Sequence, residues 1–273
     1  MMLSASSTLA RWTAVLLAAC ATPLPQADVL RSIEPLGDNG HVVIIIVDGL
    51  RPDLISAERT PTLQRLVDEG ASTLDARTVR PSVTLPSITS MLTGLRPADH
   101  GVTWNSYDPD MEPVAATTIF DVAHDAGVTT AFFSGKVKLR HAIHPESLDT
   151  SSIRFLPDVS ITLLARAHLE EAQPGLMVVH LPNVDRAGHE FGWSSDEQRL
   201  TLRATDIAIA SIMAMVESDT IEGPIRVIVT ADHGGEDKNH QRRRGLFNSR
   251  AFYIRPYIHG ICRFCSAVLK KSI

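Results

Sequence analysis

The chain has 273 residues, of which 44% are hydrophobic and 21% are charged. This length and composition suit one large α/β domain with a sizeable buried core, with or without small appendages. The formal net charge of −5 excludes a general nucleic-acid-binding protein, because such proteins usually carry a basic surplus.

The first twenty residues are typical of an export signal rather than of folded structure. Arg11 precedes a short apolar run that ends at Ala19 and is followed by Cys20, and this order of a basic start, a hydrophobic stretch and small residues is the signal-peptide pattern. The run is too short to span a bilayer. The segment LAAC also resembles a bacterial lipobox, so residues 1–20 are either a lipoprotein signal with a lipidated Cys20 or an ordinary cleavable signal. We therefore expect an exported protein, periplasmic or lipid-anchored in the cell envelope, with residues 21–40 as a linker.

The rest of the chain alternates between predicted strands and predicted helices. Continuous apolar runs predict buried strands at residues 41–47, 176–181 and 225–231, and the segment TTAFFS predicts a further strand at residues 129–134. Apolar spacing and terminal residues such as Thr, Pro and Gly predict helices at residues 60–70, 86–94, 118–126, 159–172 and 195–217. Buried strands that alternate with helices predict an α/β sandwich with a central, mainly parallel sheet flanked by helices.

Acidic residues follow three of the predicted strands. They are Asp48 after the first strand, Asp185 with His189 four residues later, and the adjacent pair Asp232 and His233. Ligands of open α/β sheets bind outside the carboxyl ends of the strands, so these side chains are expected to converge. Carboxylates and imidazoles suit zinc, manganese and other divalent ions. The alternative for any one of these aspartates is a helix cap or a turn, and it is the coincidence of three that favours a metal site.

Thr84 is the candidate nucleophile. It lies in the segment PSVTLPS, just before a predicted helix, where free backbone N–H groups and the helix dipole favour a phosphate group. A neighbouring metal ion would lower the pKa of the hydroxyl and create a usable alkoxide. The alternative is that Thr84 or Ser87 serves only as a helix N-cap.

Five segments together resemble a known family. The segments VVIIIVDGLRPD, TPTLQRLVDEG, PSVTLPSITSMLTGLRPADHGVTWN, HLPNVDRAGHEFG and TADHGG occur in this order within residues 41–240. They resemble the nucleotide pyrophosphatase/phosphodiesterase family of the alkaline phosphatase superfamily. The resemblance implies an alkaline-phosphatase-like three-layer sandwich, with the catalytic domain in residues 41–240.

The resemblance also implies two divalent metal ions, with zinc as the expected metal. The ligands of the first ion would be Asp48, Thr84, Asp232 and His233. The ligands of the second ion would be Asp185, His189 and His240, the last as the candidate for the histidine that the family supplies downstream of its Asp-His-Gly motif.

The implied reaction is the hydrolysis of phosphodiester or pyrophosphate bonds in a small phosphate ester or a nucleotide. Thr84 would attack phosphorus and form a phosphothreonine intermediate, and Asn105 would bind the substrate by donating a hydrogen bond to the phosphoryl oxygens. Phosphomonoester or phosphonate hydrolysis on the same site is the alternative. A sulfatase is disfavoured, because sulfatases of this superfamily carry Cys or Ser at the position of Thr84 and Arg at that of Ile88.

The likeness stops after His240. Residues 241–273 begin with a run of three arginines and continue with a segment unlike the family. This tail is either a genuine divergent end or the product of a truncated or frameshifted reading frame. An inactive, phosphate-binding or misfolded member of the family is therefore the rival to an active enzyme.

Overall fold

The computed structural model describes residues 36–37, 39–236 and 250–255. The chain divides into a unit of residues 1–37 and a unit of residues 38–273, and every helix and strand below belongs to the second unit. The predicted export signal, most of the predicted linker and His240 lie outside the described residues.

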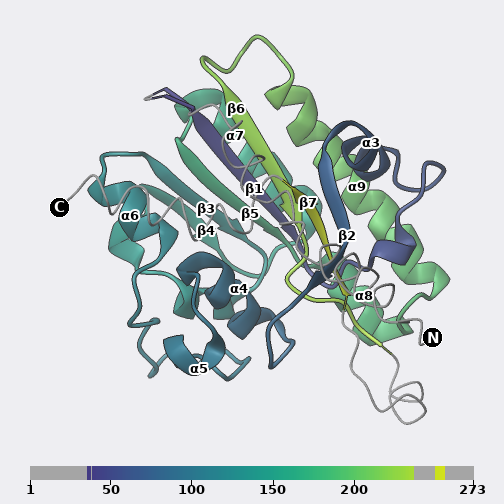
Figure 1. Cartoon of the computed structure of the whole chain (residues 1–273), viewed down its shortest axis with the longest axis horizontal. Coiled ribbons are helices and arrows are strands. Elements are labelled where there is room, and N and C mark those ends of the chain that lie inside the picture. The colour runs from purple at the N-terminus through teal and green to yellow at the C-terminus, as the bar shows by residue number, and fades with distance from the viewer. Residues whose placement is uncertain (1–35, 38, 237–249, 256–273) are drawn as a thin grey trace, which may run out of the picture. The chain divides into compact units, whose positions relative to one another are not determined.

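A seven-stranded sheet forms the centre of the second unit (Figure 1). Its strands are β1 (His41–Val47), β2 (Ala71–Arg77), β3 (Thr130–Ser134), β4 (Thr150–Ile153), β5 (Leu176–Leu181), β6 (Ile225–Thr230) and β7 (Arg250–Arg255). They are ordered β2-β7-β6-β1-β5-β3-β4. The neighbours from β6 to β4 are all parallel, and β7 is antiparallel to both β6 and β2. The predicted mainly parallel sheet is therefore confirmed.

Helices cover both faces of this sheet. The α-helices are α3 (Pro61–Glu69), α4 (Thr84–Thr93), α5 (Pro97–His100), α6 (Ile119–Asp125), α7 (Asp158–Ala172), α8 (Asn183–Phe191) and α9 (Asp196–Val216). The short 3-10 helices are η1 (Pro52–Leu54), η2 (Val137–Ala142) and η3 (Pro145–Ser147). Within the described part of the chain, no helix has both the length and the apolar character needed to cross a membrane.

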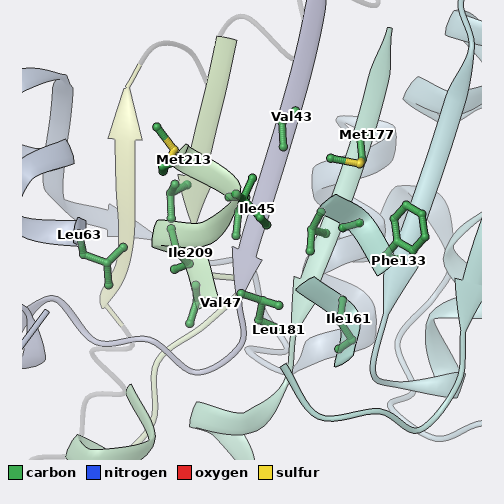
Figure 2. Packing of buried hydrophobic residues seen from close by; sticks show 14 of the residues in the cluster. Val43, Ile45, Val47, Leu63, Phe133, Ile161, Met177, Leu181, Ile209 and Met213 are labelled. Carbon is green, nitrogen blue, oxygen red and sulfur yellow. The ribbon is translucent and has the colours of Figure 1, made fainter. Parts of the chain in front are cut away.

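The central strand β1 is buried on both sides because its side chains alternate between two hydrophobic clusters. Val43, Ile45 and Val47 pack with residues of α3, α7 and α9, as Figure 2 shows for part of this cluster. Ile44 and Ile46 pack on the opposite face with residues of α4 and α6. A strand buried on both faces needs a continuous apolar run. This packing gives the predicted three-layer sandwich.

The predicted elements differ from the structure in a few places. Helix α4 begins at Thr84, two residues before the predicted start at Pro86. A proline in the first turn removes no helical hydrogen bond, because N–H groups of that turn have no partner within the helix. The segment after β5, for which no helix was predicted, is helix α8. Strands β2, β4 and β7 were not predicted.

Candidate active site

The predicted site residues that the structure describes lie together at the carboxyl ends of the parallel strands. Asp48 directly follows β1, and Asp232 and His233 follow β6. Thr84 is the first residue of α4, and Asp185 lies in the first turn of α8, which follows β5. All five side chains are buried. The parallel sheet thus places residues from distant parts of the sequence at one edge, as expected for the ligand-binding edge of an open α/β sheet.

Gly49 allows the turn after β1 to approach helix α8. Its φ is +74°, and a Cβ atom at this position would lie 2.9 Å from the Cα of Asp185. Only glycine adopts this backbone conformation readily and leaves space for the helix. The Gly49 N–H also donates a hydrogen bond to Asp232 Oδ1 at 3.3 Å, so one residue joins the ends of β1, β5 and β6.

The four ligands predicted for the first ion lie close to one another. Two groups of side chains in this region have ligand atoms that could hold a metal ion, namely Asp48 with Asp185 and His233, and Asp48 with His180 and Asp232. Thr84 Oγ1 lies 3.4 Å from Asp48 Oδ2 and 3.4 Å from His233 Nε2. His233 Nε2 lies 3.4 Å from Asp48 Oδ1 and 3.6 Å from Asp232 Oδ2. Tetrahedral zinc, with bonds of about 2.0–2.2 Å, separates its ligand atoms by about 3.3–3.6 Å. Asp48 Oδ1 and Asp232 Oδ2 are also buried without a hydrogen-bond partner, as expected of atoms that bind a cation.

The second predicted ligand pair shares one face of α8. Asp185 and His189 are four residues apart on the helix, and His189 Nε2 lies 3.3 Å from Asp185 Oδ1. The Asp185 oxygen is buried without a hydrogen-bond partner, whereas the His189 side chain is 69% exposed. Helix α8 brings the two side chains together, because residues i and i+4 are neighbours on a helix surface. The third predicted ligand of this ion, His240, is not among the described residues.

Lys136 is a site residue that sequence reasoning missed. Its Nζ lies 2.6 Å from Asp48 Oδ2 and 2.6 Å from Asp185 Oδ2, and it donates a hydrogen bond to Thr84 Oγ1 at 3.2 Å. The ammonium therefore contacts one carboxylate of each predicted ligand set, where it would compete with a bound cation. Lys136 follows β3 by two residues, so the strand-end rule could have identified it.

His180 is the second residue that was missed. It lies inside β5 and is fully buried. Its Nε2 forms a 2.9 Å hydrogen bond with Asp48 Oδ2, and its Nδ1 forms a 3.2 Å bond with the hydroxyl of Ser134. A hydrogen bond of this kind fixes the orientation of a ligand carboxylate. With Asp48 held in this way, its Oδ1 lies 3.4 Å from His233 Nε2 and its Oδ2 lies 3.4 Å from Thr84 Oγ1.

The clustered charges perturb one another strongly. Burial raises the pKa of Asp48, but the charge of Lys136 and the hydrogen bond from His180 outweigh it and hold the pKa below its ordinary value. Burial and the neighbouring Asp48 carboxylate raise the pKa of Asp232 to about 7. Burial lowers the pKa of Lys136, yet the carboxylates of Asp48 and Asp185 raise it overall, so this side chain is an ammonium. The site therefore attracts positive charge.

Asn105 lies beside the N-terminus of α4. Its Oδ1 accepts hydrogen bonds from the Leu85 N–H at 2.9 Å and from Lys138 Nζ at 2.8 Å. These bonds occupy the amide oxygen and orient the residue, which leaves the amide nitrogen as the group for a substrate oxygen. Burial and the charge of Lys136 lower the pKa of Lys138 to about 8. This arrangement fits the substrate-binding role predicted for Asn105, which stays a prediction.

Comparison with known sequences identifies relatives of this chain. The sequence model described as type I phosphodiesterase / nucleotide pyrophosphatase matches residues 42–251, which includes all the site residues above. An uncharacterised pyrophosphatase/phosphodiesterase of Schizosaccharomyces pombe is 25% identical over 71% of this chain and 44% of its own length. Human ectonucleotide pyrophosphatase/phosphodiesterase family member 1 is 23% identical over 71% of this chain and 23% of its own length. The chain thus spans less than half the length of these relatives.

Solved structures of other proteins share the fold of this chain. Murine ectonucleotide pyrophosphatase/phosphodiesterase 5 superposes with a TM-score of 0.61 at 20% identity, covering 71% of this chain and 57% of its own. Phosphonoacetate hydrolase from Sinorhizobium meliloti superposes with a TM-score of 0.54 at 22% identity, covering 72% of this chain and 56% of its own. The fold is alkaline-phosphatase-like, as predicted. Because the family model matches residues 42–251, which are most of the chain, this chain belongs to the type I phosphodiesterase/nucleotide pyrophosphatase family.

Proposed function

We propose that the protein is a metal-dependent hydrolase of phosphodiester or pyrophosphate bonds, with Thr84 as its nucleophile. The observation that carries this proposal is the position of the Thr84 hydroxyl. It lies at the start of α4 and 3.4 Å from both Asp48 and His233. A hydroxyl beside candidate metal-binding groups at the N-terminus of a helix is placed to attack a bound phosphoryl group.

Two divalent ions, with zinc as the expected metal, would complete the site. The first would be held by Asp48, Thr84, Asp232 and His233, and the second by Asp185, His189 and a further ligand for which His240 is the candidate. When bound, such ions lower the pKa of a coordinated hydroxyl and neutralise negative charge on the phosphoryl oxygens. The buried carboxylate oxygens without hydrogen-bond partners support this assignment.

The chain's own residues would carry the reaction in two steps. In the first, the bond between Thr84 Oγ1 and phosphorus would form as the bond from phosphorus to the leaving oxygen breaks, and the proton lost by the Thr84 hydroxyl would be balanced by one gained by the leaving group. In the second, water cleaves the phosphothreonine bond, which releases the phosphate product and restores the hydroxyl. Asn105 would donate a hydrogen bond from its amide nitrogen to a phosphoryl oxygen in both steps.

A related structure provides an analogy for a functional threonine. Murine ectonucleotide pyrophosphatase/phosphodiesterase 5 has been solved in complex with AMP as an inactive variant in which a threonine is replaced by alanine. That description concerns the murine protein, and its likeness to this chain is 19% identity with a TM-score of 0.62. By analogy, we propose a nucleotide or a similar small phosphate ester as the substrate class.

The two lysines favour a second candidate, a phosphonate or phosphomonoester with additional negative charge. Lys136 contacts Thr84, and Lys138 contacts Asn105, so two cations border the place of the phosphoryl group. Phosphonoacetate hydrolase has the same fold. Hydrolysis rates of the p-nitrophenyl ester of thymidine monophosphate, p-nitrophenyl phosphate and phosphonoacetate would separate the candidates. The first substrate should be the fastest if the protein is a phosphodiesterase.

Replacing Thr84 tests the proposal directly. Thr84→Ala should abolish turnover of the preferred ester while most of the bound zinc remains, whereas Thr84→Ser should retain measurable activity because it keeps a hydroxyl. Zinc content is measured on the same samples by elemental analysis. Unchanged turnover in Thr84→Ala would refute the nucleophile assignment. A wild-type protein with no turnover and fewer than two ions per chain would support the rival, a non-catalytic member.

Export to the cell envelope is a separate proposal. It rests on the sequence pattern of residues 1–20 alone. Mass spectrometry of the mature N-terminus would distinguish a lipidated Cys20 from an ordinary cleaved signal.

A further inference from the structure

Helix α8, which carries Asp185 and His189, is capped by a residue from another helix. Its own N-cap residue, Pro182, has no side-chain group to accept a hydrogen bond from the first turn. The N–H of Asn183 instead donates to Asp158 Oδ1 at 3.0 Å. Asp158 is the first residue of α7, so the cap comes from 25 residues earlier in the sequence.

The Asp158 carboxylate also joins α8 to the long helix α9. The hydroxyl of Thr205 in α9 donates to Asp158 Oδ2 at 2.6 Å. Asp158 is only 3% exposed, and a buried carboxylate is costly unless each oxygen has a partner. Both oxygens have one here. One buried side chain therefore ties together the N-terminus of α7, the N-terminus of α8 and the middle of α9.

We propose that Asp158 is a positioning residue for the metal ligands on α8 and that Thr205 holds it in place. This inference rests on the proposed function, because it assumes that Asp185 and His189 hold one of the two ions. Asp185 follows the capped residue Asn183 by two positions, and His189 lies one turn further along the helix. A shift of the capped end would therefore move both ligands together and separate them from the ligands that follow β1 and β6.

The charges around Asp158 are consistent with this role. Burial raises the pKa of Asp158 to about 6, and the negative charge of Asp48 adds to this rise. The hydrogen bonds from Thr205 and Asn183 and the positive charge of Arg186 oppose it. The carboxylate is therefore ionised at neutral pH. Hydrogen bonds to an ionised acceptor are about twice as strong as neutral ones.

The test measures zinc affinity site by site, by competition with a chelator, in the full-length chain. Asp158→Ala should weaken the binding of one ion about 10- to 100-fold, as is typical for residues that orient metal ligands, and leave the other ion bound. Asp158→Asn should restore most of the affinity. Its amide oxygen can accept from the Asn183 N–H, and its NH₂ can donate to Thr205, whose hydroxyl also bonds to the Thr201 carbonyl.

Asp206→Ala is the matched control. Asp206 is equally buried in α9, and its carboxylate caps helix α3 by accepting from the N–H groups of Thr62 and Leu63 at 3.1 Å and 2.8 Å. Helix α3 carries no predicted ligand. The control should therefore lose stability, as measured by urea unfolding, and retain the affinity for both ions.

The outcomes separate this inference from the proposed function. A wild-type protein that binds fewer than two ions would contradict the proposed function itself. A wild type with two ions and an Asp158→Ala variant with unchanged affinities would overturn only the positioning role, as would an equal weakening in Asp206→Ala. If Asp158→Ala does not fold, Thr205→Val replaces it. That variant should weaken the same ion several-fold, and unchanged affinity would overturn the inference.

Discussion

Replacing Lys136 by methionine should have opposite effects on the stability of the metal-free protein and on its affinity for zinc. The Lys136 ammonium lies 2.6 Å from a carboxylate oxygen of Asp48 and 2.6 Å from one of Asp185. The side chains of the lysine and of these two aspartates are 13%, 0% and 6% exposed. The ammonium is therefore the buried counter-charge of both carboxylates, and methionine keeps the length of the side chain without the charge.

The size of the loss follows from the burial of the pair. Removing one partner of a buried ion pair costs about 3–5 kcal/mol, because the remaining charge is left uncompensated. We expect the unfolding free energy of metal-free Lys136→Met to fall by about this amount. Zinc would supply the missing charge, and in the variant it would not compete with an ammonium. The variant should therefore bind zinc more tightly and gain more stability from it than the wild type, by the linkage between binding and unfolding.

Urea unfolding with a chelator and with excess zinc measures both effects. Lys138→Met is the control, because the Lys138 ammonium donates to the neutral amide oxygen of Asn105 and leaves no buried charge unpaired when it is removed. Its loss should cost no more than about 1.5–3 kcal/mol, the range of a hydrogen bond with one charged partner, and zinc should not change that loss. If Lys136→Met loses the same stability with zinc as without it, the ammonium and the metal ions do not share a place. That result would refute the interpretation of Lys136 as a stand-in for a cation.

Three further changes test the geometry of the site. Gly49→Ala should lower the unfolding free energy by about 1–2 kcal/mol for the left-handed backbone alone. It should also weaken zinc binding, because the new Cβ would lie 2.9 Å from the Cα of Asp185. A variant with wild-type melting temperature and zinc affinity would contradict the close approach. His180→Phe removes the hydrogen bond to Asp48. In a chelator competition, it should lower the affinity for the ion that Asp48 would hold by about 10- to 100-fold. Unchanged affinity would show that His180 does not orient the carboxylate. The third change concerns pH. Asp158 has a raised pKa of about 6 in the folded protein against an ordinary 3.8, so the folded state binds this proton more tightly, and its contribution to stability is complete below the ordinary value and is lost as pH rises through about 6. The unfolding free energy of metal-free wild type, relative to that of Asp158→Asn, should therefore fall by about 2 kcal/mol between pH 4 and pH 7. A difference that does not vary with pH would show that Asp158 has no raised pKa.

The sequence predicted the main elements of the fold and the placement of the aspartates for the same physical reason. Strand β1 is apolar on both faces, so its pattern indicates a buried parallel strand, and the residue after such a strand lies at the edge where ligands bind. Asp48 and Asp232 follow from this rule. Strand β2 was missed because most of its side chains are exposed, and the apolar pattern is then absent.

The remaining features depend on contacts between distant parts of the chain. Helix α8 contains Gly188 and follows Pro182, which locally favour a turn, but Asp158 caps the helix from elsewhere in the sequence. His180 is one polar residue within an apolar strand, and nothing in the local pattern indicates that Asp48 lies beside it. Lys136 follows a strand, but a single lysine in a loop has no distinctive spacing. These residues become recognisable only when the sheet brings them together.

Anomalous X-ray diffraction at the zinc edge, on crystals grown with zinc, tests the central claim most directly. We predict two peaks at the carboxyl ends of β1, β5 and β6. One should lie about 2.0–2.2 Å from ligand atoms of Asp48, Asp232 and His233 beside the Thr84 hydroxyl, and the other at a similar distance from Asp185 and His189. Peaks elsewhere on the protein, or none at these side chains in zinc-saturated crystals, would contradict the account.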